Sequence, residues 1–345
     1  MRLFSDITRD RLRNFKRIRR AYYSFWILAV AFLLSLFSEV FAGSRPLLLG
    51  YQGSLYFPVL FFYPGKTFGG PYQTEADYKS LQKSADFRAR GGWMILPPVP
   101  YDPLRSQLEL SGSPPHAPSF AHLMGTDAGA RDILARIIHG FRISMLFALF
   151  VAAVTGILGV IIGGVQGYLG GRTDIIMQRF IEIWSALPFL YVVILMGSLL
   201  GRSFAVLLIV MSFFTWVGLS YYMRGEFYKT RNMTYINAAR ALGIGPVRIF
   251  FRHILPNSLT PLITILPFTL IGAIGTLTAL DFLGFGLPPP TPSWGELMKQ
   301  GMDNLHAPWI SVFATLSLFI TLLLATFVGE GLREAFDPRA EYRIE

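Results

Sequence analysis

Six apolar runs, each about 20 residues long, constrain this chain more than any other feature of its sequence. A run of that length can cross a bilayer as a helix, and in lipid a helix satisfies its own backbone hydrogen bonds. Only 15% of the 345 residues are charged, against roughly 25% in soluble domains. The sequence therefore predicts an all-α integral membrane protein with about six transmembrane helices. The runs occupy residues 22–41, 143–165, 177–199, 204–223, 260–280 and 309–328.

The positive charge of the chain is concentrated beside these runs. The net charge is +10, and arginine and lysine cluster at residues 2–20 and 224–252. Such clusters are typical of the cytoplasmic side of membrane proteins, which favours a membrane orientation signal over a nucleic-acid-binding arm. We predict a cytoplasmic N-terminus at 1–21 and an uncleaved anchor at 22–42, because the basic and apolar parts are both too long for a signal peptide. Six crossings then return the C-terminus to the cytoplasm.

Residues 43–140 differ in kind, since glycine, proline, tyrosine and charged residues dominate them. They predict an irregular insert with turns on the outer face of the membrane. The apolar stretch Leu55–Tyr63 is too short to span, so it either packs on the rest of the insert or lies at the membrane surface. The insert ends in an amphipathic helical segment, residues 125–142, which Asp127 is expected to cap.

Glycine and proline mark two of the predicted spans. Glycine recurs every fourth residue at Gly159, Gly163, Gly167 and Gly171, which predicts close packing of the second span against a neighbouring helix. Pro188 predicts a bend in the third span. The chain has no cysteine, so disulfides and thiol chemistry are excluded.

One polar, basic segment separates the fourth and fifth predicted spans. Residues 235–242 favour a short helix, because the three alanines among them are strong helix formers. Gly243 can take a positive φ and end that helix, and Pro246 suits the first position of a second helix. The sequence thus predicts a helix–glycine–helix elbow at residues 235–256, within a loop that covers 224–256. A basic amphipathic helix on the membrane surface is the alternative.

The elbow resembles the EAA loop of ABC importer permeases in the spacing of its Ala-Ala pair, its glycine and its Ile-Leu-Pro end. Asn237 departs from the pattern, since the family usually has glutamate there. In that family the loop is a coupling helix that docks into a cleft on a separate ATPase subunit. The resemblance implies that coupling involves Asn237, Ala238, Ala239, Arg240, Leu242, Gly243, Ile254, Leu255 and Pro256.

Three further motifs resemble the dipeptide/oligopeptide/nickel group of these permeases. They are GTDAGARD at 125–132, LGFGLPPPTPSWG at 283–295 and GEGLREAFDPR at 329–339. The departures from the group pattern are Ala130 for glycine, and Glu330 and Glu334 for aspartate. The resemblance covers about residues 120–340. The run ARDILARIIHGFRIS and the long insert most resemble permeases for peptides and microcin C.

The resemblance implies a MetI-like ABC permease core at residues 141–345, embedded in the lipid of a bacterial inner membrane. It implies a transport subunit rather than an enzyme, forming half of the translocation pathway of an ATP-driven peptide importer. The implied partners are a homologous second permease subunit, cytoplasmic ATP-binding subunits and a periplasmic peptide-binding protein. ATP and Mg²⁺ are expected on the ATPase, so no cofactor, metal or nucleic acid is expected on this chain.

Asp281 and Trp294 are the candidates for the side that meets substrate or the binding protein. Asp281 either meets a cationic peptide terminus or lies at the outer membrane surface, since a charge in mid-bilayer costs about 2.5–3.5 kcal/mol. Trp294 lies in a proline-stiffened loop that is either only rigid or also receives substrate.

Two other classes of protein fit the sequence less well. An ion-coupled secondary transporter is the alternative function, but it would need acidic or histidine side chains inside its spans, and the second, fourth and sixth runs have none. An intramembrane enzyme is disfavoured because the sequence has no zinc-protease or serine-hydrolase motif.

Overall fold

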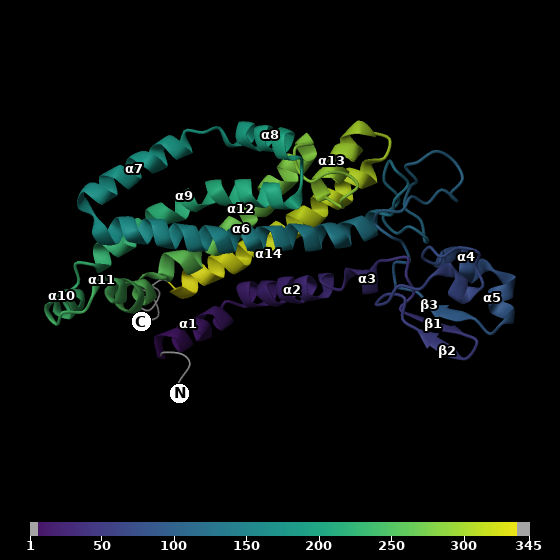
Figure 1. Cartoon of the computed structure of the whole chain (residues 1–345), viewed down its shortest axis with the longest axis horizontal. Helices are drawn as coiled ribbons and strands as arrows, with labels where there is room; N and C mark the ends of the chain where they lie inside the picture. The colour runs from purple at the N-terminus through teal and green to yellow at the C-terminus, as the bar shows by residue number, and fades with distance from the viewer. Residues whose placement is uncertain (1–5, 337–345) are drawn as a thin grey trace. The chain divides into compact units, whose positions relative to one another are not determined.

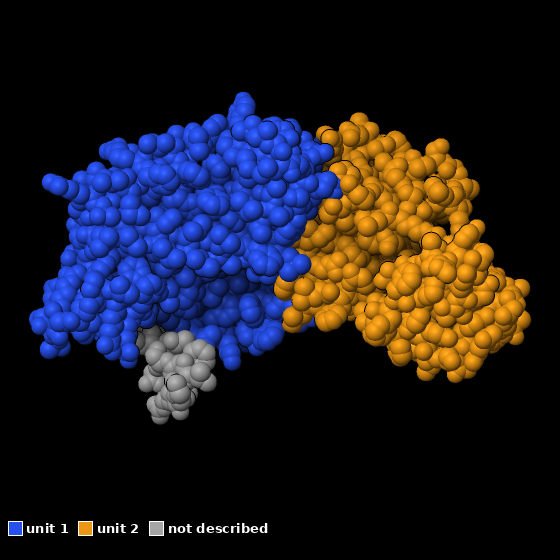
Figure 2. Space-filling model, viewed as in Figure 1, with its two compact units in different colours: residues 1–30, 144–288, 318–345 blue, residues 31–143, 289–317 orange. Residues whose placement is uncertain are grey.

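The computed structural model of the chain describes residues 6–336. Arg2 of the first basic cluster and the Asp337-Pro338-Arg339 end of the third motif lie outside the described residues. The chain forms two compact units, which Figure 2 shows in different colours. Unit 1 comprises residues 1–30, 144–288 and 318–345, and unit 2 comprises residues 31–143 and 289–317.

Four of the described helices are long and apolar enough to cross a membrane. They are α6 (Ile133–Leu169), α9 (Phe204–Thr230), α12 (Thr260–Leu283) and α14 (Pro308–Phe336). Each contains one of the predicted apolar runs, which confirms those four predictions. Helices α7 (Gly171–Ser185) and α8 (Phe189–Leu200) meet at 71° and make a fifth crossing if the bent pair is one span (Figure 1).

The break between α7 and α8 lies where the sequence predicts a bend. Pro188 is the residue before α8, and α7 ends at Ser185. Proline has no backbone N–H and disfavours a helical conformation in the residue before it, which favours a break in the helix at this point. The third predicted span is therefore two helices.

The first apolar run also forms two helices. Helix α1 (Asp6–Arg17) precedes it, and the run itself contains α2 (Arg19–Ser35) and α3 (Ser38–Phe41). The Ser35 hydroxyl donates to the carbonyl oxygen of Phe32 at 2.7 Å, a bond back to the preceding turn of a kind that bends helices. At 17 residues α2 is about 25 Å long, so the crossing of the membrane by this run stays a prediction.

Close packing of α6 on α9 organises unit 1. A Cβ at Gly163 would overlap the carbonyl oxygen of Ser220, and one at Gly167 would overlap that of Arg224. Gly159, Gly163 and Gly167 therefore serve helix packing, as predicted, whereas Gly171 begins α7 and has open space around its Cβ position. Helix α9 also packs against α8 and α12, so it is central to this unit.

Unit 2 contains a small sheet within an otherwise largely irregular insert, so the all-α fold has one local exception that the sequence did not predict. Strands β1 (Leu48–Tyr51), β2 (Ser54–Tyr56) and β3 (Trp93–Ile95) pair antiparallel in the order β2-β1-β3. Strands of three or four residues are too short to show a clear alternation in the sequence. Beside them lie α4 (Tyr78–Lys83) and α5 (Ala85–Ala89) (Figure 1). The insert also contains the 3₁₀ turn η1 (Gly65–Phe68).

An aromatic core holds the insert together. The rings of Tyr51 and Phe87 stack with their centroids 5.5 Å apart, and Phe68 meets Tyr51 edge-on at 5.8 Å. Such ring pairs stabilise by about 0.5–1.5 kcal/mol beyond the area they bury. The buried members of this core are Leu49, Tyr51, Phe68, Ala76, Tyr78 and Phe87.

Residues 133–142 of the amphipathic segment and the second predicted span form one helix of 37 residues, α6. Its cap is Asp132, whose carboxylate accepts from the backbone N–H of Ala135 at 2.8 Å, so the prediction that Asp127 caps it is wrong. Asp127 instead closes the preceding turn by accepting from the N–H groups of Gly129 and Arg131, both at 2.9 Å.

Candidate coupling surface

The elbow of unit 1 has the predicted helix–glycine–helix form. Helix α10 (Thr234–Ala241) ends before Gly243, whose φ of +77° suits a residue without a Cβ. Pro246 is the first residue of α11 (Pro246–Arg248). The chain then continues as a π-helical turn, η2 (Ile249–Ile254), and a 3₁₀ turn, η3 (Leu255–Ser258), before α12.

One face of the elbow packs into the core of unit 1. Ile236 and Ala239 of α10, with Ile249, Phe250 and Ile254 of η2, are buried against α9. Their partners there are Leu219, Met223 and Phe227. Ala239 and Ile254 are thus core residues, and Leu255 is half-buried against the same cluster. These three predicted site residues position the elbow and offer a partner little surface.

The other face of the elbow is exposed and partly apolar. Leu242 is 81% exposed, and the remaining exposed site residues are Asn237, Ala238, Arg240, Gly243 and Pro256. Val247 and Phe251, 70% and 58% exposed, extend this surface, although neither is among the predicted site residues. Their spacing of four places both on one helical face, which was the available signal. Exposed apolar side chains grouped in this way mark interaction sites.

Arginines tie the base of the elbow to neighbouring helices. Both oxygens of Asp174 on α7 accept from the guanidinium of Arg224 on α9, each at 2.6 Å. Arg231 donates to the carbonyl oxygens of Gly167 and Tyr168, at 3.2 and 3.1 Å, where α6 ends. Carbonyls of the last turn lack partners in the helix and carry partial negative charge, so a guanidinium there is favourable. The base of the elbow is therefore held to α7 by an ion pair and to the end of α6 by hydrogen bonds.

A buried charge cluster in unit 2 joins two of the sequence motifs. Asp127 and Arg136 are both 0% exposed, and Arg136 also pairs with Glu296 of α13 (Trp294–Asp303). Arg131 bonds Asp127 at 2.8 Å and Glu296 at 3.3 Å. Two arginines and two carboxylates make the cluster neutral, as buried charges require.

Trp294 is buried beside this cluster. Its indole N–H donates to the carbonyl oxygen of Ile137 at 3.3 Å, and its ring lies against Phe141 and Gly140. The side chain is 1% exposed. The structure therefore gives Trp294 the position of a core residue.

Asp281 lies near the end of α12 in unit 1 and is also buried. Its carboxylate accepts from the backbone N–H of Leu287 at 2.6 Å, which closes the turn after the helix. A Cβ at Gly286 would overlap the same carboxylate. Asp281 thus shapes the loop that follows it.

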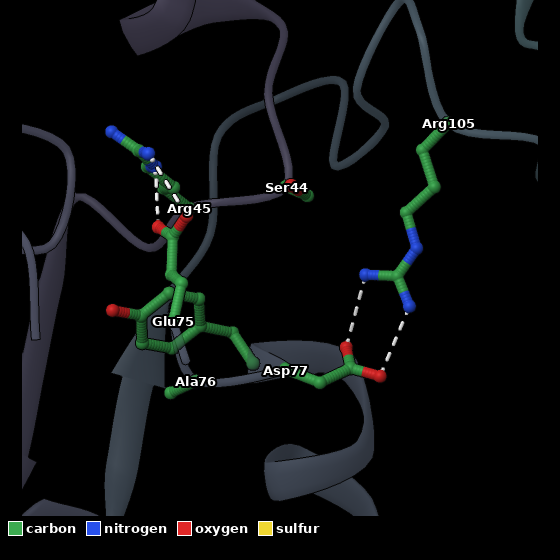
Figure 3. A pocket seen from close by; sticks show the side chains of 7 residues that line it. Ser44, Arg45, Glu75, Ala76, Asp77 and Arg105 are labelled. Atoms are coloured by element: carbon green, nitrogen blue, oxygen red, sulfur yellow. Dashed lines mark hydrogen bonds and ion pairs between the residues drawn. The ribbon is translucent and has the colours of Figure 1, made fainter. Parts of the chain in front are cut away.

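A cavity of about 160 Å³ in the insert is lined by charged side chains (Figure 3). The Arg105 guanidinium holds both oxygens of Asp77, at 3.1 and 3.0 Å, and Arg45 holds Glu75. The bond from Arg105 lowers the pKa of Asp77 from 3.8 to about 2. Because each guanidinium already has its carboxylate, the charges around this cavity are satisfied within the insert.

Comparison with known proteins identifies the family. Residues 155–342 match the family described as "binding-protein-dependent transport system inner membrane component", and the chain belongs to it. It is therefore an ABC transporter permease subunit of a bacterial inner membrane, a transport component and not an enzyme. The alternative of an ion-coupled secondary transporter is thereby overturned.

Two relatives are similar over nearly the whole chain and a third over about two thirds of it. The peptidoglycan transport system permease protein YejE of Agrobacterium fabrum is 44% identical over 99% of this chain and 95% of its own length. The inner membrane ABC transporter permease protein YejE of Escherichia coli is 44% identical over 98% and 99%. The oligopeptide transport system permease protein OppC of Haemophilus influenzae is 36% identical over 63% and 70%.

Proposed function

We propose that this chain forms half of the translocation pathway of an ATP-driven importer for peptides, and that its elbow docks the ATPase. The observation that carries the coupling role is the exposed surface of Leu242, Val247 and Phe251, held by a buried inner face. A helix that only lay on lipid would not need that base. The names of the relatives, peptidoglycan and oligopeptide permeases, support a peptide-containing solute, and microcin C is one candidate.

The partners in this proposal are a second, homologous permease subunit, a periplasmic peptide-binding protein and one or two ATP-binding subunits. ATP and Mg²⁺ bind to the ATPase. The anchor 22–42 crosses the membrane, both termini lie in the cytoplasm, and residues 43–140 lie in the periplasm, where they form one compact unit with residues 289–317 of the core 141–345. Asp281 and Trp294 act on the outer side by holding the shape of their loops.

The test compares two glycines of the elbow. The elbow requires a left-handed conformation at Gly243, which costs valine about 1–2 kcal/mol. We expect Gly243→Val to relieve this strain by changing the angle between the two short helices. Gly245 has a φ of −65° and open space around it, so Gly245→Val is the matched control. Both variants are reconstituted with the partner subunits in proteoliposomes, and uptake of a labelled tripeptide is measured beside ATP hydrolysis.

We expect Gly243→Val to separate ATP hydrolysis from uptake while the complex stays assembled, and Gly245→Val to behave as wild type. Equal uptake by the two variants would refute the coupling role of the elbow. Competition by unlabelled muropeptide or microcin C against the tripeptide then defines the substrate class.

A further inference from the structure

A loop of the insert presents five large apolar side chains that the rest of unit 2 does not cover. We call residues 55–62 the apolar loop. Leu60 is 71% exposed, and Phe61 and Phe62 are each 60% exposed. Leu55 and Phe57 are exposed as well. The sequence allowed this stretch either to pack on the insert or to lie at the membrane, and these exposures exclude the first for its five exposed side chains.

The apolar loop is held in a fixed conformation. The backbone N–H groups of Leu60 and Phe61 both donate to the carbonyl oxygen of Phe57, at 3.0 Å. At its ends, the rings of Tyr56 and Tyr63 meet edge-on with centroids 5.2 Å apart, and Tyr56 also contacts Phe68 of the insert core. The exposed side chains are therefore presented by an ordered loop, which argues for a surface that is covered in use.

The loop lies near the place where the chain leaves the first apolar run. The backbone N–H of Val59 donates to the carbonyl oxygen of Pro46 at 3.2 Å. Pro46 is five residues beyond the end of α3, so at most about 18 Å of chain separates them. Leu33, Leu36 and Phe37, just before α3, are also exposed and apolar. The apolar loop is thus a second exposed apolar surface, and it is connected to that of the first run by a short segment of chain.

The charges around the loop distinguish lipid from a polar partner. The sequence has no acidic or basic residue between Arg45 and Lys66, so the loop and both its flanks are uncharged. Charged side chains are costly below the headgroups, whereas aromatic and leucine side chains are favourable at the boundary between headgroups and acyl chains. Burying one phenylalanine or leucine side chain contributes about 1.5–3 kcal/mol.

We infer that the apolar loop inserts into the outer leaflet of the membrane and docks the insert on the lipid surface. This inference rests on the proposed crossing of the membrane by residues 22–42. The insert then has two attachments to the bilayer: the anchor that leads into it and the loop that Leu60, Phe61 and Phe62 form.

The absence of cysteine from the chain allows a direct test with single nitroxide labels. The full chain is reconstituted in liposomes as Phe61→Cys, Gln82→Cys or Leu33→Cys, each spin-labelled. Collision of the label with O₂, which dissolves in lipid, is compared with collision with a water-soluble nickel chelate. Gln82 is exposed on α4 beside Lys83 and is the aqueous control, and Leu33 on α2 reports on the anchor.

We expect the label at position 61 to lie about 5–10 Å into the interface, with O₂ favoured over the chelate, and the label at 82 to show the reverse order. Replacing Leu60 and Phe62 by aspartate should shift the label at 61 toward the values at 82. A label at 61 that collides with the chelate as freely as at 82 would overturn the inference. So would one shielded from both reagents, which indicates a covering protein. The label at position 33 shows whether the anchor itself lies in lipid. A negative result at 61 can therefore be distinguished from an anchor that does not cross the membrane.

Discussion

The charge cluster of unit 2 and the elbow of unit 1 use arginine in opposite ways. Arg136 is fully buried and meets two carboxylates, Asp127 and Glu296. Arg240, Arg248 and Arg252 are exposed, and none of them forms an ion pair with a carboxylate in residues 6–336. Buried arginines that are paired with carboxylates fix the internal structure of unit 2. Exposed arginines without such a pair, beside exposed apolar side chains, can still bind a partner. Both regions contain motifs that resemble those of the permease family. The presence of a motif therefore does not show whether a region stabilises the fold or binds a partner.

The largest expected effect is that of opening the cluster. Arg136→Ala leaves two carboxylates near one remaining arginine in a buried site, and breaking a buried pair in this way costs about 3–5 kcal/mol. Thermal unfolding of the full chain in detergent measures the loss. Arg90→Ala removes an exposed pair with Asp86 and should have a much smaller effect, because water screens exposed ion pairs. Similar losses in the two variants would show that the cluster is no more than a surface ion pair.

The second effect tests the base on which the elbow stands. Gly163→Ala forces a Cβ against the carbonyl oxygen of Ser220 and should destabilise the protein by about 1–3 kcal/mol. Gly218 on α9 has open space around its Cβ position, so Gly218→Ala should stabilise by up to about 1 kcal/mol through helix propensity. Replacement of glycine by alanine should thus lower the stability of the protein at position 163 and raise it at position 218. Melting temperatures that move in the same direction would contradict the close approach of α6 to α9.

The third effect is a pH dependence of the insert. The pKa of Asp77 is lowered to about 2, so its pair with Arg105 contributes stability above pH 3.8. That contribution is lost as the pH falls from 3.8 toward 2. The pair is partly exposed, so the contribution is about 0–1 kcal/mol. Asp77→Asn should lower the melting temperature at pH 6 and have a smaller effect at pH 2.5. A constant difference between wild type and variant would exclude this linkage.

The smallest effect on stability is expected on the exposed face of the elbow. Val247→Ser should change the free energy of unfolding by less than about 0.5 kcal/mol, because the side chain is exposed, while it weakens retention of the ATPase during copurification. Ile249→Ser, two residues away and buried, should destabilise by about 2–5 kcal/mol. Equal losses of stability would mean that Val247 belongs to the core.

The sequence predicted the parts of the fold that depend on long or local patterns. Four apolar runs predicted the four long helices. Gly243 and Pro246 predicted the end of α10 and the start of α11 to within one residue. It did not predict the sheet of the insert, because strands of three or four residues carry almost no period. It did not predict that Asp132 would replace Asp127 as the cap, since that depends on where the turn at 127–131 closes.

Within the candidate site, the sequence selected a stretch and the structure divided it by exposure. Ala239 and Ile254 share their motif with Leu242, yet two face the core and one faces outward. The pairing of Trp294 with the start of α6 joins residues more than 150 positions apart, and a local pattern contains no information on such contacts. Whether the exposed face binds an ATPase stays a prediction.

The buried charge cluster also has a consequence for how the chain is made. Arg136 leaves the ribosome 160 residues before Glu296. Translation at about 5–20 residues per second separates the two by roughly 8 to 32 seconds. During that interval Asp127, Arg131 and Arg136 carry a net charge of +1 (−1 + 1 + 1) and must stay hydrated. The N-terminal end of α6 therefore reaches its final arrangement only after most of the chain has been synthesised.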